Sequence, residues 1–188
     1  MNFATVPNLI CLLRIALAVP IVWLLANDRY QATLILFAIA ALSDALDGYL
    51  AKTFDWASDI GKVLDPVADK LLLVSVFITL AWLGLVPMWL AAVAVTRDLI
   101  IGIGAWTYQQ LFGPVDGHPT LVSKFNTLVQ ILFVIAVVGR AAYPGTPQWP
   151  IIALGGLVFV TTVVSGLDYV ATYVRKAIAV SRARRAPA

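Results

Sequence analysis

Residues 44–69 read DALDGYLAKTFDWASDIGKVLDPVAD and lie between two long apolar runs. This segment contains two aspartate pairs, Asp44 with Asp47 and Asp65 with Asp69. Side chains three or four residues apart lie on one face of an α-helix. The loop between the pairs allows the two helices to return antiparallel, so we expect all four carboxylates to meet at one site.

The composition of the chain indicates that lipid is its main solvent. Of its 188 residues, 61% are hydrophobic and 12% are charged, and the mean hydropathy is +0.91. A soluble domain carries about 25% charged residues to cover its surface. The net charge of +3 therefore indicates contact with anionic lipid head groups rather than with nucleic acid. The single cysteine, Cys11, excludes an internal disulfide framework.

Six apolar windows have about the 20-residue length of a membrane-spanning helix. They cover residues 7–27, 30–51, 61–84, 86–109, 120–142 and 149–173. No Lys or Arg precedes the first window, so we expect a retained span rather than a cleaved signal peptide. The sequence predicts an all-α integral membrane protein with six transmembrane helices. We expect a single domain over residues 1–188, with a basic tail at residues 174–188.

The distribution of Lys and Arg predicts the orientation of the chain. Most basic residues outside the windows follow the sixth window or flank the loop between the second and third: Arg175, Lys176, Arg182, Arg184, Arg185, Lys52 and Lys62. On the other side lie Arg29 and Arg140. Because cytoplasmic loops are rich in Lys and Arg, we expect both termini in the cytoplasm. The lack of a basic presequence favours a bacterial inner membrane.

Charged residues inside the windows gather in the cytoplasmic half of the predicted bundle. They are Arg14, the four aspartates, Lys124 and Asp168, with Asn126 beside them, whereas Arg97 and Asp98 fall near the middle of the fourth window. A charge at mid-depth costs at least about 2.5 kcal/mol. A polar cavity that opens to the cytoplasm explains this placement, so we expect the active site to face the cytoplasm.

Four carboxylates in one site of low dielectric constant need compensating charge. Divalent metal ions provide it, and hard oxygen ligands favour Mg2+ or Mn2+. Gly48 and Gly61 lie close to the aspartates in sequence and allow close helix packing or close approach of a ligand's phosphates. The alternative is that the aspartates only pair with Lys52, Lys62 and Lys70 at a helix boundary.

The segment resembles the signature of the CDP-alcohol phosphatidyltransferase family, D-x2-D-G-x2-A-R-x8-G-x3-D-x3-D. The spacing matches throughout, and only Lys52 departs from it, where the family has Arg. Lysine keeps the charge but lacks the bidentate fork of arginine, which weakens any planar phosphate contact. The opening Pro7-Asn8-Leu9, with Arg14 and the six windows, extends the resemblance over the whole chain.

The resemblance implies a cofactor, a lipid substrate and a set of site residues. Two divalent ions, Mg2+ or Mn2+, would be bound by Asp44, Asp47, Asp65 and Asp69. CDP-diacylglycerol would be bound by Asn8, Asp44, Asp47, Gly48, Ala51, Lys52, Gly61 and Asp65. The carboxylate of Asp69 would accept a proton from the acceptor alcohol, and CMP would leave.

Two branches of the family use different acceptor alcohols. The stretches Thr96-Arg97-Asp98 and Lys124-Phe-Asn126 are similar to the CMP-forming cardiolipin synthase branch, which uses phosphatidylglycerol. Phosphatidylglycerophosphate synthases, which use glycerol 3-phosphate, typically have more basic residues there. A lipid phosphodiester needs fewer cations than a phosphate monoester, so we predict an acceptor site at Arg97, Lys124 and Asn126 and cardiolipin as the product.

Several alternatives remain open. Glycerol 3-phosphate is the second acceptor to consider, Arg97 could form an ion pair with Asp98, and Lys124 could anchor at the membrane interface. Gly155-Gly156 and Gly166 form small faces that suit helix packing, and we predict a homodimer.

A small cation channel or transporter could also use the aspartates as its ion site. A conduction path would place polar residues on both sides of the midplane, whereas the outer halves of these windows are nearly free of charge.

Overall fold

The chain forms six α-helices in the part that the structure describes. The computed structural model describes residues 5–54, 61–112 and 120–185, with side chains for most of 13–43, 70–110 and 120–175. The helices are α1 (Thr5–Ala26), α2 (Tyr30–Phe54), α3 (Gly61–Trp82), α4 (Met88–Phe112), α5 (Leu121–Ala142) and α6 (Trp149–Arg185). The prediction of an all-α fold is confirmed, and five of the six predicted windows match a helix to within three residues at each end.

The sixth helix is longer than its apolar window. It was expected to end near residue 173, but it continues to Arg185 and has 37 residues. No Gly or Pro interrupts the chain between Gly166 and Pro187, and Ala, Arg and Lys are good helix formers. At about 1.5 Å per residue, α6 is roughly 55 Å long, well beyond the 30 Å hydrocarbon core of a bilayer. The predicted basic tail is therefore mostly a continuation of α6.

Three helices are long and apolar enough to cross a membrane, as judged on the described residues. These segments are Met88–Ala105, Leu121–Ala142 and Trp149–Thr172. Helices α1, α2 and α3 contribute the shorter apolar stretches Leu13–Ala26, Tyr30–Ser43 and Lys70–Trp82. The stretches in α2 and α3 end at Ser43 and begin at Lys70 because the neighbouring residues 44–54 and 61–69 lie outside the described side chains. Six complete spans therefore remain a prediction.

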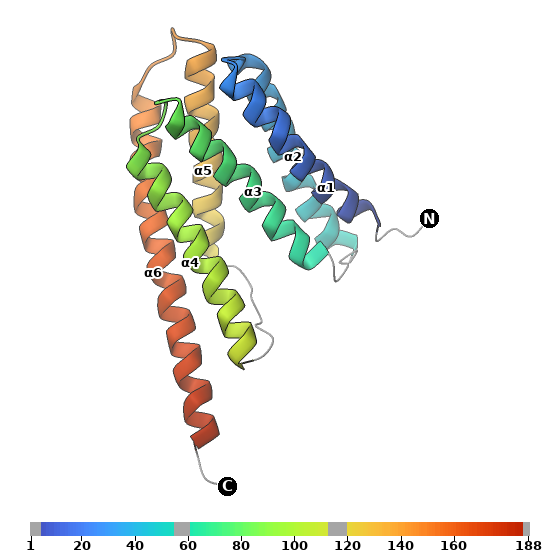
Figure 1. Cartoon of the computed structure of the whole chain (residues 1–188), viewed down its shortest axis with the longest axis vertical. Helices are drawn as coiled ribbons and strands as arrows, with labels where there is room; N and C mark the ends of the chain where they lie inside the picture. Colours follow the sequence, from blue (N-terminus) through green and yellow to red (C-terminus); the bar gives the residue numbers. More distant parts are fainter. Residues whose placement is uncertain (1–4, 55–60, 113–119, 186–188) are drawn as a thin grey trace.

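The helices form two neighbouring groups of three (Figure 1). Helix α1 packs against α2 and α3, while α6 packs against α4 and α5. The groups meet where α2 contacts α5 and where α3 contacts α4 and α5. Phe77 of α3 and Phe133 of α5, both buried, lie at this junction with ring centroids 6.0 Å apart. An apolar core thus joins the two groups next to the polar residues described below.

A tight turn connects α3 to α4. Gly84 has a φ of +72°, a left-handed conformation that costs glycine little because it has no Cβ atom. The amide of Leu85 donates to the carbonyl of Leu80 at 2.9 Å and so closes the end of α3. The turn lets α3 and α4 return antiparallel, so residues near the start of α3 lie beside residues of the second half of α4.

The contact of α6 with α5 depends on one small residue. A Cβ atom added to Gly155 would lie 3.3 Å from Cε2 of Phe133 and 3.8 Å from Cδ2 of Leu90. We expect Gly155→Leu to lower the free energy of unfolding by about 1–3 kcal/mol, because it overpacks this contact. Gly156→Leu is the matched control, since nothing lies within 4 Å of a Cβ atom there. Thermal unfolding in detergent measures both, and equal melting temperatures would contradict this packing.

Candidate functional site

The two aspartate pairs lie on the helices predicted for them. Asp44 and Asp47 belong to α2 near its end, and Asp65 and Asp69 belong to α3 near its start. The backbone is helical at all four positions, so each pair shares one helix face. Their side chains lie outside the described residues. The same holds for the predicted CDP-lipid ligands on α1, α2 and α3: Asn8, Gly48, Ala51, Lys52 and Gly61.

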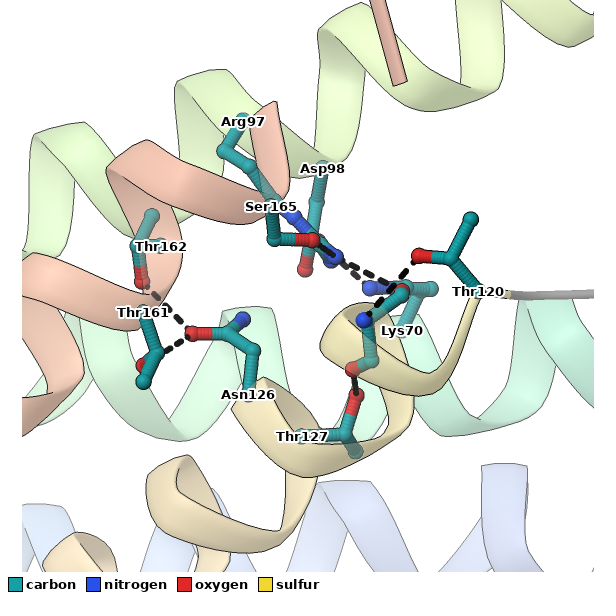
Figure 2. A network of polar contacts seen from close by, with 10 residues as sticks. Lys70, Arg97, Asp98, Thr120, Asn126, Thr127, Thr161, Thr162 and Ser165 are labelled. Atoms are coloured by element: carbon teal, nitrogen blue, oxygen red, sulfur yellow. Dashed lines mark hydrogen bonds and ion pairs between the residues drawn. The ribbon is translucent and has the colours of Figure 1, made fainter. Parts of the chain in front are cut away.

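A polar cluster begins at the residue after Asp69. The ammonium of Lys70, on α3, donates to Oδ1 of Asp98 on α4. Nη1 of Arg97 donates to the same oxygen at 2.6 Å. Figure 2 shows both cations converging on this carboxylate. We call Lys70, Arg97 and Asp98 the charged cluster; it joins α3 to α4 beside the predicted catalytic helix segment.

Arg97 also joins α4 to α5 and α6. Its Nη2 donates to Oγ of Ser123 on α5 at 2.7 Å and to Oγ of Ser165 on α6. The Arg97 side chain is only 3% exposed. Its aliphatic part passes close to α6, because a Cβ atom on Gly166 would lie 3.6 Å from Cγ of Arg97. Arg97 is therefore a fixed, buried positive charge held by three side chains from three helices.

The three members of the charged cluster differ in their exposure. The two cations share one carboxylate oxygen of Asp98. The exposed fraction of the side chain is 3% for Arg97, 8% for Asp98 and 36% for Lys70. Lys70 is therefore the most accessible member of the charged cluster.

The predicted acceptor residues do not form one cluster. Asn126 is fully buried, and its Oδ1 accepts from the hydroxyls of Thr161 at 2.8 Å and Thr162 at 2.9 Å. Lys124, two residues earlier on α5, is exposed. The structure therefore places Arg97 and Asn126 inside the bundle and Lys124 on its surface.

Two buried polar atoms on α5 have no hydrogen-bond partner in the described part of the chain. They are Nδ2 of Asn126 and Oε1 of Gln130, which lie one helical turn apart. Gln130 and Asp98 also border a small cavity of about 10 Å3. A cavity of this size accommodates about one water molecule. The interior between α3, α4 and α5 is therefore polar on one side and apolar on the other.

A larger apolar groove of about 370 Å3 lies between α4 and α6. Its lining includes Val93 and Ile100 of α4 and Val163 and Leu167 of α6, with Arg97 as its charged residue. The groove is thus mostly apolar and lies between two of the helices that are long enough to cross a membrane.

Sequence reasoning considered the ion pair of Arg97 with Asp98, which the structure contains, but it missed the serine partners of Arg97 and the contact of Lys70 with Asp98. Lys70 was considered only as a partner of the aspartates, yet it contacts Asp98, 28 residues away. Ser165 lies 68 residues from Arg97. No local pattern links such distant residues. The one local indication that Lys70 belongs to a polar site was that it directly follows Asp69 in the sequence.

Comparisons with known proteins agree with the motif. A probable CMP-forming cardiolipin synthase of Drosophila melanogaster is 34% identical and is aligned over 90% of this chain and 58% of its own length. The CMP-forming cardiolipin synthase of Rattus norvegicus is 33% identical, over 70% of this chain and 49% of its own length. A chloroplastic CDP-diacylglycerol–glycerol-3-phosphate 3-phosphatidyltransferase 1 of Oryza sativa subsp. japonica is 31% identical. The alignment covers 89% of this chain and 56% of the length of that relative. The chain thus spans less than two thirds of each of these relatives.

The family model of CDP-alcohol phosphatidyltransferase matches residues 4–167, which include both aspartate pairs and the charged cluster. The chain belongs to the CDP-alcohol phosphatidyltransferase family.

Proposed function

We propose that the protein transfers a phosphatidyl group from CDP-diacylglycerol to phosphatidylglycerol, forming cardiolipin and CMP. The observation that carries this proposal is the paired aspartate motif on α2 and α3 in a member of this family. The similarity to CMP-forming cardiolipin synthases supports phosphatidylglycerol as the acceptor. The family match gives no support to a small cation channel or transporter.

The proposed setting is the bacterial inner membrane, with six spans and both termini in the cytoplasm. The three long apolar helices support a membrane protein. The basic residues that end α6, from Arg175 to Arg185, support a cytoplasmic carboxyl terminus. The active site would then face the cytoplasm, where CDP-diacylglycerol presents its water-soluble nucleotide.

Two divalent ions, Mg2+ or Mn2+, fit the donor set of the motif. Four carboxylates supply hard oxygen ligands, and each pair lies on one helix face. Bound ions would neutralise the pyrophosphate of CDP-diacylglycerol and the charge that develops on the departing CMP. Asp44, Asp47 and Asp65 would hold them, and Asp69 would complete the set.

The chemical step requires the acceptor hydroxyl to lose its proton as it attacks phosphorus. Asp69 is the proposed base, since a carboxylate within hydrogen-bond reach accepts that proton directly. The oxygen of the acceptor forms a bond to the phosphorus of the phosphatidyl group, and the bond from that phosphorus to CMP breaks. Residues of α1, α2 and α3 would hold CDP-diacylglycerol, while residues of α4 and α5 would hold the acceptor.

The comparisons favour a lipid acceptor. Two of the relatives named above are CMP-forming cardiolipin synthases, at 34% and 33% identity. Glycerol 3-phosphate remains the second candidate acceptor, because the rice relative named for that substrate is 31% identical to this chain. The homodimer remains a prediction.

The choice of acceptor can be measured with purified protein in detergent. We expect CMP release and cardiolipin formation when CDP-diacylglycerol, Mg2+ and phosphatidylglycerol are all present. Omission of phosphatidylglycerol should stop both. If glycerol 3-phosphate alone supports CMP release, the proposed acceptor is wrong although the transferase chemistry is right.

The role of Asp69 can be measured with Asp69→Asn, which keeps the shape of the side chain but not its basicity. We expect turnover to fall by about 10²–10⁴-fold, the usual contribution of a general base, while CDP-diacylglycerol still binds. Asp28→Asn is the control, because it removes the same charge from the exposed α1–α2 turn and should leave turnover unchanged. Near-normal turnover of Asp69→Asn would remove this residue from its role.

The metal requirement can be measured by chelation. We expect EDTA to stop CMP release and an excess of Mg2+ or Mn2+ to restore it, because the carboxylates then bind metal ions again. Restored activity should depend on the concentration of the added ion. Full turnover in excess chelator would show that the aspartates act without a metal ion.

A further inference from the structure

We propose that one internal water molecule binds between α3, α4 and α5, where it donates one hydrogen bond to Gln130 and one to Asp98. The site is the cavity of about 10 Å3, which is bordered by Phe77 of α3, Ala94 and Asp98 of α4, and Gln130 of α5. The inference concerns how the charged cluster is held in the bundle, so it does not depend on the identity of the acceptor.

Gln130 is a buried polar side chain that lacks a donor for its oxygen. It is 1% exposed, and its Oε1 atom has no hydrogen-bond partner in the described part of the chain. From Phe133 onward the buried residues of α5 are all apolar, so Gln130 lies where the polar interior ends. An amide oxygen buried without a donor costs free energy, and buried polar side chains nearly always have a partner in the protein or in ordered water.

Asp98 supplies the second acceptor of the site. Both of its described contacts use Oδ1, which receives hydrogen bonds from Lys70 and Arg97. An ionised carboxylate has about four acceptor positions on its two oxygens, so Asp98 has capacity for a further donor. The side chain of Asp98 is only 8% exposed, so bulk water meets little of that capacity.

The size and the chemistry of the cavity select water as the ligand. A volume of about 10 Å3 accommodates one water molecule. Because the cavity is so small, the polar groups that border it lie within reach of the same molecule. Both groups are acceptors, and water has two hydrogens to donate. A divalent cation requires about six oxygen ligands, whereas only two of the described side chains around the cavity contain oxygen.

The proposed water gives α5 a second link to the charged cluster. The first link is the hydrogen bond of 2.7 Å from Nη2 of Arg97 to Oγ of Ser123. Gln130 follows Ser123 by seven residues, so the two lie about two helical turns apart on the same face of α5. One link holds Arg97 and the other holds Asp98, so each of these two neighbours on α4 is tied to α5.

The sign of the effect of Gln130→Met tests the hydrogen bond to the water. Methionine is also unbranched but has no strong donor or acceptor. We expect the melting temperature of the whole chain in detergent to fall by about 2 °C or more, because the water loses one of its two partners. If the amide had no ligand, its replacement would remove an unpaired buried group and raise the melting temperature.

A rise of the melting temperature in Gln130→Met, or no change, would therefore overturn the inference. Gln31→Met is the matched control, because it makes the same replacement at an exposed position of α2. Its melting temperature should differ from that of the wild type by less than about 2 °C.

Ala94→Val tests the site from the opposite side, because it adds two methyl groups at the border of the cavity and displaces the water. We expect the melting temperature to fall by about 2 °C or more in the wild-type background. In the Gln130→Met background the fall should be at most half as large, because the water has already lost a partner there. Overpacking alone would give equal falls in both backgrounds, and filling a dry gap would raise the melting temperature; either result would contradict the site.

Ala91→Val is the control for this comparison. Ala91 is buried on the same helix but does not border the cavity, so its replacement should have the same effect in both backgrounds.

An experimental structure at high resolution tests the wild-type protein directly and decides the case in which a variant does not fold. We expect one water oxygen about 2.5–3.0 Å from Oε1 of Gln130 and from a carboxylate oxygen of Asp98. A cavity without water, or a Gln130 side chain that turns to a partner within the protein, would show that the proposed site does not exist.

Discussion

The shared carboxylate oxygen of Asp98 is the interaction on which the polar half of the bundle depends. Lys70 of α3 and Arg97 of α4 both donate to it, and Arg97 continues the connection to α5 and α6 through two serines. Charges inside a membrane protein are expensive unless they meet one another. The chain meets this requirement with one acid between two bases, so four helices converge on this cluster.

The core of the bundle is divided into an apolar part and a polar part. Phe77 and Phe133 pack at the junction between the two helix groups, and the polar contacts of Asn126 with α6 lie one to two helical turns away along α5. Apolar packing fixes how closely the helices approach, while hydrogen bonds select which helix faces meet. Threonine hydroxyls are well suited to the second task, because they also bond to the carbonyl one turn earlier, as Thr161 does with Leu157. A site held in this way needs little rearrangement to receive a substrate.

The helices were predictable from sequence to a large extent, and the site only in part. Apolar windows located all six helices, because lipid imposes a minimum length on each span. They failed at the end of α6, because hydropathy does not report the helix propensity of a basic segment from Arg175 to Arg185. The aspartate pairs were recognisable because their spacing is local. The partners of Arg97 were not, because Ser123 and Ser165 meet it only through tertiary packing. Asn126 was predicted to contact substrate; its side-chain oxygen accepts from two threonines of α6, whereas its Nδ2 has no hydrogen-bond partner among the described residues.

The length of α6 has a mechanical consequence. One uninterrupted helix carries Thr161, Thr162 and Ser165, which contact α5 and α4, and then continues through the basic residues to Arg185. About 20 residues, or roughly 30 Å of helix, separate Ser165 from that end. A straight helix of this length acts as a rigid rod. In the proposed topology, the depth at which its basic end rests among the lipid head groups sets the height of Ser165 beside Arg97. The position of the bilayer surface would thus fix the depth of Ser165 and Arg97 in the membrane.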